Sequence, residues 1–199
     1  MGRKLRTDYE GAWHHVMNRG ARRAPILADD QHIEIFLELM AETVERFGIE
    51  IHAYALMPNH FHLLVRSVRG NISRAIQYLS GHFTRWVNAR RKWDGPVFRG
   101  RFRSELIEDE RSLLVVAAYI HLNPIRARLV RRLDARCLTS HRAYLGHDIP
   151  QDWLCVDSIS DVAGDRKNFT DFVHDVRVGK ETWPEDMSYE SLSAEAKHK

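Results

Sequence analysis

Two histidines separated by one residue, His60 and His62, are the side chains whose types and spacing most directly suggest chemistry. They follow the turn-forming run Met57-Pro58-Asn59 and lie in an apolar stretch that predicts a strand. Because side chains two apart in a strand point to the same face, the two imidazoles would stand side by side. They would supply half of a divalent-metal site. The alternative is a pair of half-buried strand histidines with ordinary hydrogen bonds.

A tyrosine and an asparagine four residues apart, Tyr119 and Asn123, form the second candidate pair. The apolar spacing around them predicts a helix from about Asp109 to Pro124, so both side chains would project from one helix face. An asparagine oxygen could complete the metal site and would place Tyr119 beside the metal. The structural alternatives are a core tyrosine and an N-cap at Asn123 for a following helix over 124–131.

Three further histidines are expected to lie outside this site. His14 and His15 fall in a predicted first strand, where adjacent side chains face opposite ways. At most one of them could join His60 and His62, and a packing role is the expectation for both. His121 lies between the candidate tyrosine and asparagine and is expected to point elsewhere.

The distribution of charge indicates a polyanionic partner. Residues 66–103 carry ten basic residues against one acid, Asp94, which gives a balance of +9, while residues 152–199 carry eleven acids and six bases. A solvated surface usually mixes the two signs, so the basic stretch favours nucleic acid. Phe98 and Phe102 alternate with arginines, which favours a single strand over the alternative of an edge strand protected by charge. The arginines expected to contact phosphates are Arg19, Arg22, Arg23, Arg99, Arg101 and Arg103.

Composition sets the outer limits of the fold. The chain has 199 residues, 44% of them hydrophobic, which is enough for one main domain with a sizeable core. Two distant cysteines, Cys137 and Cys155, give no disulfide framework and favour a reducing compartment. No apolar run approaches the length of a membrane span, and the first residues lead into no signal region. The expectation is a cytoplasmic soluble protein with no membrane contact.

The periodicity of apolar residues predicts a split β-α-β order. A strand over 11–20 precedes a helix that starts at Asp29-Asp30 and stops at Gly48, and two strands joined by the turn at 57–59 follow. A helix from Asn71 is broken at Gly95-Pro96 and leads to a cationic strand over 97–106. This order is that of the ferredoxin-like α+β fold, an antiparallel sheet with two helices on one face, to which the helix from Asp109 is an addition. One more docked helix is expected within 162–179.

Several motifs along the chain together resemble those of the IS200-like, REP-associated tyrosine transposases, a branch of the HUH single-strand endonucleases. The resemblance covers about residues 9–180. The motifs are Gly11–Gly20, Asn59-His60-Phe61-His62-Leu63-Leu64, Gly95–Ser104 with Ser140–Leu145, and Tyr119-Ile120-His121-Leu122-Asn123-Pro124-Ile125-Arg126-Ala127. The resemblance implies a domain over 1–150 and a helical extension over 151–180, and a flexible tail is expected over 181–199.

The resemblance also implies roles for single residues. His60 and His62 would bind Mg²⁺ or Mn²⁺ with Asn123 as third ligand, and Tyr119 would attack DNA to form a 5′-phosphotyrosine and release a 3′-OH. Arg126 joins the residues expected to bind DNA. The partner would be single-stranded or hairpin DNA, and the protein a monomer or a homodimer. Two alternatives stay open: a domesticated hairpin-binding protein that does not cut, and a metal-dependent nuclease that uses water.

Overall fold

A four-stranded antiparallel sheet organises the computed structural model, which describes residues 6–135 and 138–180. The strands are β1 (Ala12–Arg19), β2 (Glu50–Met57), β3 (His60–Ser67) and β4 (Arg103–Ile107), in the spatial order β2-β3-β1-β4. The long central strands β1 and β3 pair with each other, and all neighbouring strands run antiparallel. The predicted ferredoxin-like arrangement is therefore confirmed.

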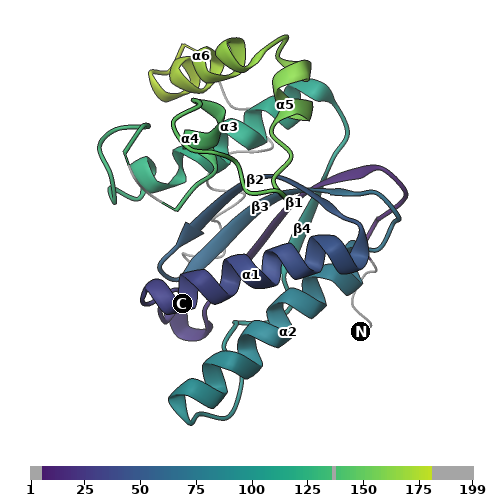
Figure 1. Ribbon diagram of the computed structural model, residues 1–199, viewed down its shortest axis with the longest axis vertical. Coiled ribbons are helices and arrows are strands. Elements are labelled where there is room, and N and C mark those ends of the chain that lie inside the picture. Colours follow the sequence, from purple (N-terminus) through teal and green to yellow (C-terminus); the bar gives the residue numbers. More distant parts are fainter. Residues whose placement is uncertain (1–5, 136–137, 181–199) are drawn as a thin grey trace.

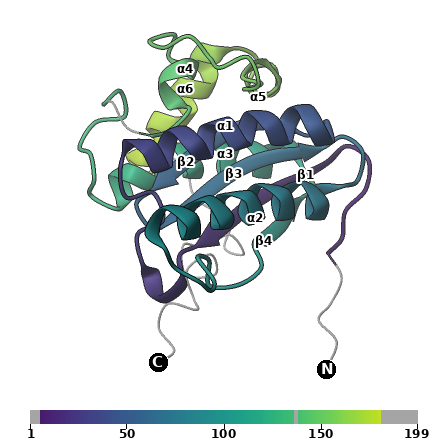
Figure 2. The same ribbon diagram turned by 60° about the horizontal axis from the view of Figure 1, so that its bottom comes forward.

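Two long helices cover one face of this sheet (Figures 1 and 2). Helix α1 (Asp30–Phe47) begins where the Asp29 carboxylate accepts a hydrogen bond from the backbone N–H of His32, and it ends at Gly48 with a φ of 61°. Helix α2 (Ile72–Arg91) lies beside it. Phe36 of α1 packs on Phe61 of β3 and on Phe83 of α2, because the apolar stripe of each helix follows the helical period. The phenylalanines at 36, 61 and 83 form the centre of this layer of the core.

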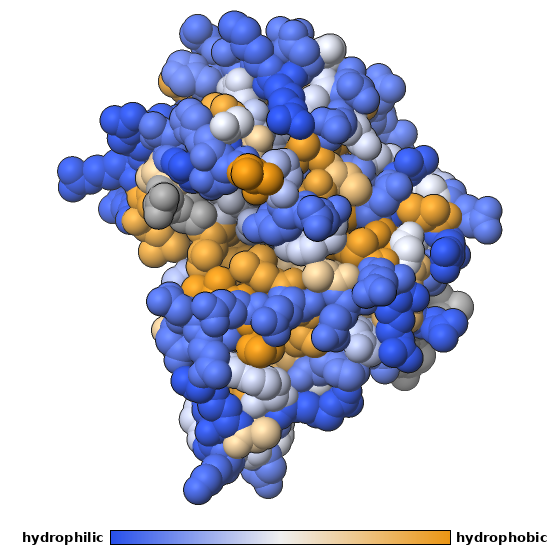
Figure 3. Space-filling view, viewed as in Figure 1, coloured by the Kyte–Doolittle hydropathy of each residue, from blue (hydrophilic) through white to orange (hydrophobic). Residues whose placement is uncertain are grey.

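The other face of the sheet is covered by α3 (Glu110–Arg126), α4 (His141–Tyr144), α5 (Asp157–Val162) and α6 (Arg166–Arg177) (Figure 1). Helix α3 lies directly on β2 and β3, and α5 and α6 pack against α3. All residues of β2 after the first are therefore buried, although their sequence alternates as in a half-exposed strand. On the face in Figure 3, apolar residues form a band between the two helical layers.

The segments that follow α3 also close one edge of the sheet. Backbone hydrogen bonds join Leu56 N–H to the Leu138 carbonyl at 2.8 Å and Ser140 N–H to the Tyr54 carbonyl at 3.1 Å. Further along, the Cys155 N–H donates to a β2 carbonyl at 2.9 Å. The outer edge of β2 is therefore occupied by residues 138–140 and 154–155. Cys155 is free, whereas Cys137 and the expected tail over 181–199 lie outside the described residues.

The predicted cationic strand over 97–106 is wrong in its first half. Phe98 bridges Gly20, and Arg103 is paired with Met17, so residues 18 and 19 of β1 oppose residues 99–102. Four residues opposite two cannot continue a ladder, so residues 99–102 bulge away from β1 and β4 begins only at Arg103. The sequence alternation there reflects this connection and not a continuous strand.

The predicted end of the third helix is also wrong. Helix α3 begins after Asp109, whose carboxylate caps Ser112 N–H at 2.8 Å, but it continues through Pro124 to Arg126. The described residues contain no separate helix over 124–131, and Asn123 lies inside α3 instead of capping a new helix. The expected C-terminal helix is present as α6, which starts at Arg166, whereas α5 was not predicted.

No helix in the described ranges combines the length and the apolarity that a membrane span requires.

Candidate active site

The predicted histidine pair lies on the face of the sheet that α3 covers. His60 and His62 share one face of β3, and their ring centroids are 5.1 Å apart. His62 is fully buried and His60 is partly exposed. In the neighbouring strand, Met17 is paired with His62 and His15 with Leu64, so His15 joins the same face. The sheet thus presents three imidazoles to α3.

Tyr119 lies over these imidazoles. Its ring centroid is 5.5 Å from that of His62 and 5.7 Å from that of His15, and it meets both rings edge-on. The tyrosine is only 3% exposed, because α3 is packed closely on β2 and β3. The structure therefore brings together three residues that are far apart in the sequence, two of which the spacing had selected.

A chain of polar contacts orients the two predicted ligands. The Asn59 side-chain oxygen accepts a hydrogen bond from His60 Nδ1 at 2.7 Å, which leaves His60 Nε2 with a lone pair. His62 Nδ1 lies 2.9 Å from His15 Nε2. His15 Nδ1 lies 3.7 Å from a Glu105 carboxylate oxygen, across the β1–β4 ladder. The carboxylate favours a proton on His15 Nδ1, so that His15 Nε2 accepts from His62 Nδ1 and leaves His62 Nε2 for a metal.

His15 and Glu105 are the functional candidates that sequence reasoning missed. The expected packing role holds for His14, which faces the α1–α2 layer and contacts Asp8 and Ser104. His15 instead faces α3, where it contacts His62 and Tyr119, and whether its role there goes beyond packing stays a prediction. The sequence offered one indication. His14 and His15 face opposite ways, so one of them had to share a face with His62 if β1 and β3 were neighbours.

Burial keeps the predicted ligands in their neutral form. It lowers the pKa of His60 to about 4, with a smaller contribution from the nearby charge of Arg19. Burial also lowers the pKa of His62 well below its ordinary value, and the neighbouring His15 and His60 act in the same direction. Neutral imidazoles are the form that binds metal. Both side chains are therefore ready to coordinate a divalent cation at neutral pH.

Asn123 lies one helical turn beyond Tyr119, as predicted, but part of its amide is engaged. Its side-chain nitrogen donates to the Tyr119 carbonyl at 3.0 Å, which fixes the amide against its own helix. The side chain is buried. Within the described residues no three His, Cys, Asp or Glu side chains form a metal cluster. The candidate donors are two imidazole nitrogens on β3 and an amide oxygen on α3. By type, such donors suit a divalent metal that keeps positions for phosphate oxygens.

Two of the predicted DNA-binding arginines border this cluster. Arg19 is paired with His60 across β1 and β3, and its Nε is buried without a hydrogen-bond partner within the described ranges. Arg126 follows Tyr119 by seven residues on α3, and its guanidinium carbon lies 5.5 Å from the centroid of the tyrosine ring. Arg19 in particular has a donor available for an anion beside His60.

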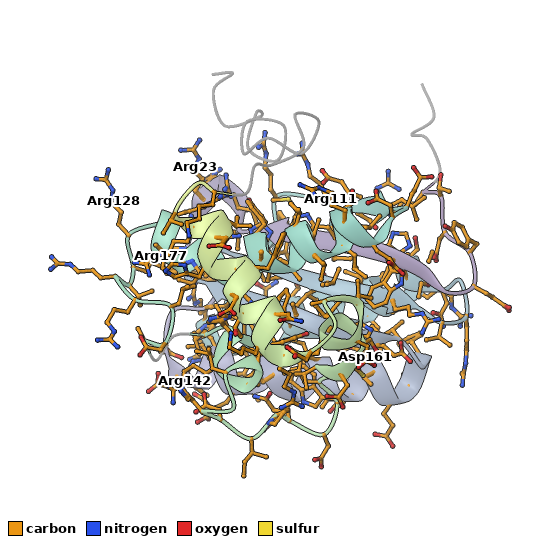
Figure 4. All side chains as sticks on the ribbon, turned by 90° about the horizontal axis from the view of Figure 1, so that it is seen from above. Arg23, Arg111, Arg128, Arg142, Asp161 and Arg177 are labelled. Atoms are coloured by element: carbon orange, nitrogen blue, oxygen red, sulfur yellow. The ribbon has the colours of Figure 1, made fainter. Side chains whose placement is uncertain are left out.

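The other predicted arginines lie further from the cluster. Arg22 and Arg23 lie in the short segment η1 (Ala21–Arg23), where both have left-handed φ angles of 53° and 60°. Arg23 projects outward on the same side as Arg128 (Figure 4). The backbone N–H of Arg99 donates to the Arg19 carbonyl at 2.9 Å, which ties the bulged connection to the end of β1. Arg101 is exposed on the bulge, and Arg103 is the first residue of β4.

His121 points away from Tyr119, as expected, into a second buried cluster. Its Nε2 lies 2.9 Å from Ser140 Oγ, and its Nδ1 lies 3.1 Å from His141 Nδ1. Phe169 of α6 covers the ring. This cluster joins α3 to α4 and α6 and has a structural role.

The buried histidines lead to a prediction about acid stability. Burial lowers the pKa of His52 to about 3 and that of His141 to about 4 from an ordinary value of 6.5. The unfolded chain therefore binds more protons below pH 6.5, and the free energy of unfolding should decrease as the pH falls from 6.5 towards 4. Each such histidine should lower the free energy of unfolding by about 2 kcal/mol between pH 6.5 and pH 5. Urea unfolding at the two pH values measures this change.

A His52→Gln variant provides the control for this prediction, because His52 is far from the candidate site and bonds the Cys155 carbonyl. Its unfolding free energy should depend less on pH than that of the wild type. Equal stability of the wild type at pH 6.5 and pH 5 would contradict the expectation.

Comparisons with known proteins bear on the family and on the fold. The family model described as "Transposase IS200 like" matches residues 8–123. A relative from Haemophilus influenzae, provisionally named as a REP-associated tyrosine transposase, is 27% identical over 134 residues, which cover 61% of this chain and 76% of the relative. A solved structure of a REP-associated tyrosine transposase bound to a REP hairpin superposes with a TM-score of 0.64 at 16% identity. It covers 78% of this chain and 92% of that one, and its likeness concerns the fold.

Proposed function

This chain belongs to the IS200-like transposase family, and on that premise we propose that it cuts and rejoins single-stranded DNA at hairpins of the REP type through a covalent bond to Tyr119. The structurally similar REP-associated tyrosine transposase is bound to a REP hairpin. The name of the relative from Haemophilus influenzae also describes it as REP-associated. The basic stretch of this chain supports a DNA partner independently of these likenesses.

One observation carries the proposal: the Tyr119 ring lies edge-on to His62, and His60 lies beside His62 on the same face of the sheet. Structural packing alone needs no such convergence of Tyr119, His60 and His62. A phosphate bound at the metal would lie next to the phenol, and the arginine beside His60 has a buried donor to hold it.

In the proposed reaction the Tyr119 oxygen attacks a phosphorus atom of the DNA backbone. The new bond joins tyrosine to the 5′ phosphate, and the bond from phosphorus to the 3′ oxygen breaks. The phenol gives up its proton to solvent, and the departing 3′ oxygen takes one up. One phosphodiester replaces another, so a second 3′-OH can reverse the step and join two strands without an external energy source.

A divalent cation, Mg²⁺ or Mn²⁺, would neutralise charge on the reacting phosphate when bound by Nε2 of His60 and of His62. Asn123 is the proposed third ligand through its amide oxygen, since the bond from its nitrogen to the Tyr119 carbonyl holds the amide in place. Arg19 and Arg126 would hold the phosphate oxygens. The remaining predicted arginines, Arg22, Arg23, Arg99, Arg101 and Arg103, would bind the flanking backbone.

The experiment that tests the proposal is a denaturing gel of the full-length protein after incubation with labelled hairpin DNA and Mn²⁺. A DNA-linked band should withstand SDS and disappear after protease treatment. DNA binding without such a band, and without cleavage, would support the non-catalytic hairpin-binding alternative instead. Cleavage without the band would support a nuclease that uses water.

The contact between His15 and His62 leads to a prediction about metal affinity. His15→Phe keeps a buried ring but removes the acceptor that orients His62 Nδ1 at 2.9 Å. Partners of this kind usually account for 10- to 100-fold in metal affinity. We expect the Kd for Mn²⁺, measured in the absence of DNA by electron paramagnetic resonance titration, to rise by about tenfold or more.

Glu105→Gln is the graded control, because it removes only the charge that favours one tautomer of His15. It should weaken Mn²⁺ binding less than His15→Phe does. A His15→Phe protein that is folded and binds Mn²⁺ as tightly as the wild type would show that His15 has a packing role after all.

A further inference from the structure

The second buried cluster lies behind α3, on the other side of that helix from the candidate nucleophile. Helix α3 lies between the sheet on one side and α4 and α6 on the other (Figure 1). Tyr119 and His121 are two residues apart, which is roughly 200° around a helix. Tyr119 faces the imidazoles of the sheet, whereas His121 faces His141 of α4 and Phe169 of α6. The two side chains therefore report on the same helix from opposite sides.

The contacts on the sheet side of α3 leave its rotation weakly defined. The bond between the Asn123 side chain and the Tyr119 carbonyl stays within α3 and does not place the helix against the sheet. On the face that α3 covers, β2 presents Ala53 and Ala55, which pair with residues of the histidine face of β3. Methyl groups make low ridges that interlock little with a helix. A directional bond behind the helix can therefore define its rotation better than this packing does.

Ser140 provides a fixed point for such a bond. Its backbone N–H donates to the Tyr54 carbonyl at 3.1 Å, and its hydroxyl oxygen accepts a hydrogen bond from the Tyr54 N–H at 3.0 Å. Tyr54 pairs with Leu63, the neighbour of His62 in β3. Ser140 is only 2% exposed. Its position is thus set by the same sheet that carries the histidines.

His121 joins α3 to this fixed point. Its Nε2 lies 2.9 Å from Ser140 Oγ, and its Nδ1 lies 3.1 Å from Nδ1 of His141. Burial lowers the pKa of His121 well below its ordinary value, and the neighbouring His141 acts in the same direction. A neutral imidazole has one N–H and one lone pair, and here both nitrogens have a partner. The ring cannot turn without losing a buried hydrogen bond.

One assignment of protons satisfies every atom of this cluster. The Tyr54 N–H donates to Ser140 Oγ, and the Ser140 hydroxyl donates to Nε2 of His121. Nδ1–H of His121 then donates to Nδ1 of His141. A break in such a buried chain leaves a donor or an acceptor without a partner, which is costly. The chain therefore connects β2 to the back of α3 without a gap.

The rotation of α3 matters for chemistry because the candidate nucleophile and the candidate ligands lie on different elements. Tyr119 belongs to α3, and the two histidines belong to β3. A helix with its side chains is about 5–6 Å in radius, so a rotation of roughly 10° moves the tip of a side chain by about 1 Å. A misplacement of about 1 Å can cost on the order of 100-fold in rate.

We propose that His121 and Ser140 are positioning residues, which set the rotation of α3 and thereby align Tyr119 with a phosphate bound on the histidine face of β3. The proposal rests on the proposed function for its reaction. It gives the buried cluster a role in the rate of cleavage in addition to its role in joining the helices. Neither side chain takes part in the chemistry itself.

The test compares substitutions, in the full-length protein, that keep or break the bond to Ser140. His121→Gln places an amide near the position of Nε2, whereas His121→Asn reaches only the position of Nδ1 and keeps the contact with His141 alone. Ser140→Ala removes the fixed point. Ser160→Ala is the matched control, because this buried hydroxyl of α5 donates to the Val156 carbonyl at 2.9 Å and lies outside the chain.

Single-turnover cleavage of a labelled hairpin with Mn²⁺ separates rate from affinity. At saturating DNA, Ser140→Ala and His121→Asn should cleave about 10- to 100-fold more slowly than the wild type. The DNA concentration at half-maximal rate and the Kd for Mn²⁺ should be unchanged. His121→Gln should recover most of the rate, and Ser160→Ala should cleave as the wild type does.

Three results would overturn the proposal. One is a wild-type rate in both Ser140→Ala and His121→Asn. Another is an equal loss of rate in His121→Gln and His121→Asn. The third is a loss that follows the free energy of unfolding, measured with urea, so that Ser160→Ala is slowed as well. That third pattern would leave the cluster with a structural role only.

A second readout does not depend on cleavage. In protein labelled with 3-fluorotyrosine, the fluorine signal of Tyr119 is the one that is absent from Tyr119→Phe. This signal should shift in Ser140→Ala and not in Ser160→Ala. If the shift appears but the wild type forms no covalent band, the positioning of α3 stands and the proposed transesterification fails. If the band forms but both the signal and the rate of Ser140→Ala match the wild type, the reverse holds.

Discussion

Replacing Tyr119 with phenylalanine should abolish the covalent protein–DNA band and reduce strand cleavage to background. The substitution removes one oxygen and keeps the ring that meets His62 and His15 edge-on, so folding and hairpin affinity should be unchanged. The loss should be complete because a phenylalanine ring has no nucleophilic atom to form the ester. Strand joining should vanish as well, since the same oxygen must leave in the reverse step. The gel, with anisotropy for hairpin affinity, measures both outcomes.

Other tyrosines provide the controls for this experiment. The Tyr78 hydroxyl contacts Glu42 on the α1–α2 side of the sheet, so Tyr78→Phe should cleave as the wild type does. The Tyr144 hydroxyl donates to the His52 carbonyl at 2.7 Å, and burial raises its pKa far above the ordinary value. It is therefore unavailable as a substitute nucleophile. Cleavage by Tyr119→Phe at the wild-type rate would remove the tyrosine from the mechanism.

The second large effect is expected at the metal site. His60→Ala should slow cleavage by about a thousandfold, because charge stabilisation by a metal at a reacting phosphate contributes several kcal/mol. Hairpin affinity should change little, since backbone contacts hold most of the substrate. Single-turnover cleavage at saturating DNA concentration, with Mn²⁺ varied, measures the loss.

Excess Mn²⁺ should not restore the His60→Ala variant, whereas it should partly restore His15→Phe, in which both proposed imidazole ligands remain. The difference between the two variants separates a ligand from a residue that orients a ligand. If His60→Ala cleaves normally at every Mn²⁺ concentration, His60 is not a ligand, and the short contact with Asn59 is its only role.

The sequence predicted the elements of the fold better than their ends. Both ends of α1 could be predicted from Asp29 and Gly48. The residues that cap the terminal backbone groups of a helix can be recognised in the sequence. The end of α3 was misjudged because packing on the sheet carries the helix past Pro124 to Arg126. The prediction for the first half of the cationic strand failed for a different reason. A bulge removes the pairing between strands but leaves the alternation of basic and apolar residues in the sequence intact.

The candidate site was predicted only as far as spacing within one element allows. His60 with His62, and Tyr119 with Asn123, are local patterns within a strand and a helix. His15 depends on the register between β1 and β3, and a slip of one residue would bring His14 to the same face instead. Glu105 depends in turn on the register of β4 against β1. Pairings between distant strands are set by the whole fold, so these two residues emerge only from the structure.

The closed edge of β2 sets how much of the chain can be removed. Residues 138–140 and 154–155 satisfy backbone groups of a strand that is buried and apolar along nearly its whole length. A fragment cut at residue 123, where the family match ends, would leave this strand as an unprotected template for pairing with a second molecule, the usual route to aggregation. The shortest soluble fragment should therefore extend past Cys155. The end of the family match is therefore expected to fall short of the end of the folding unit.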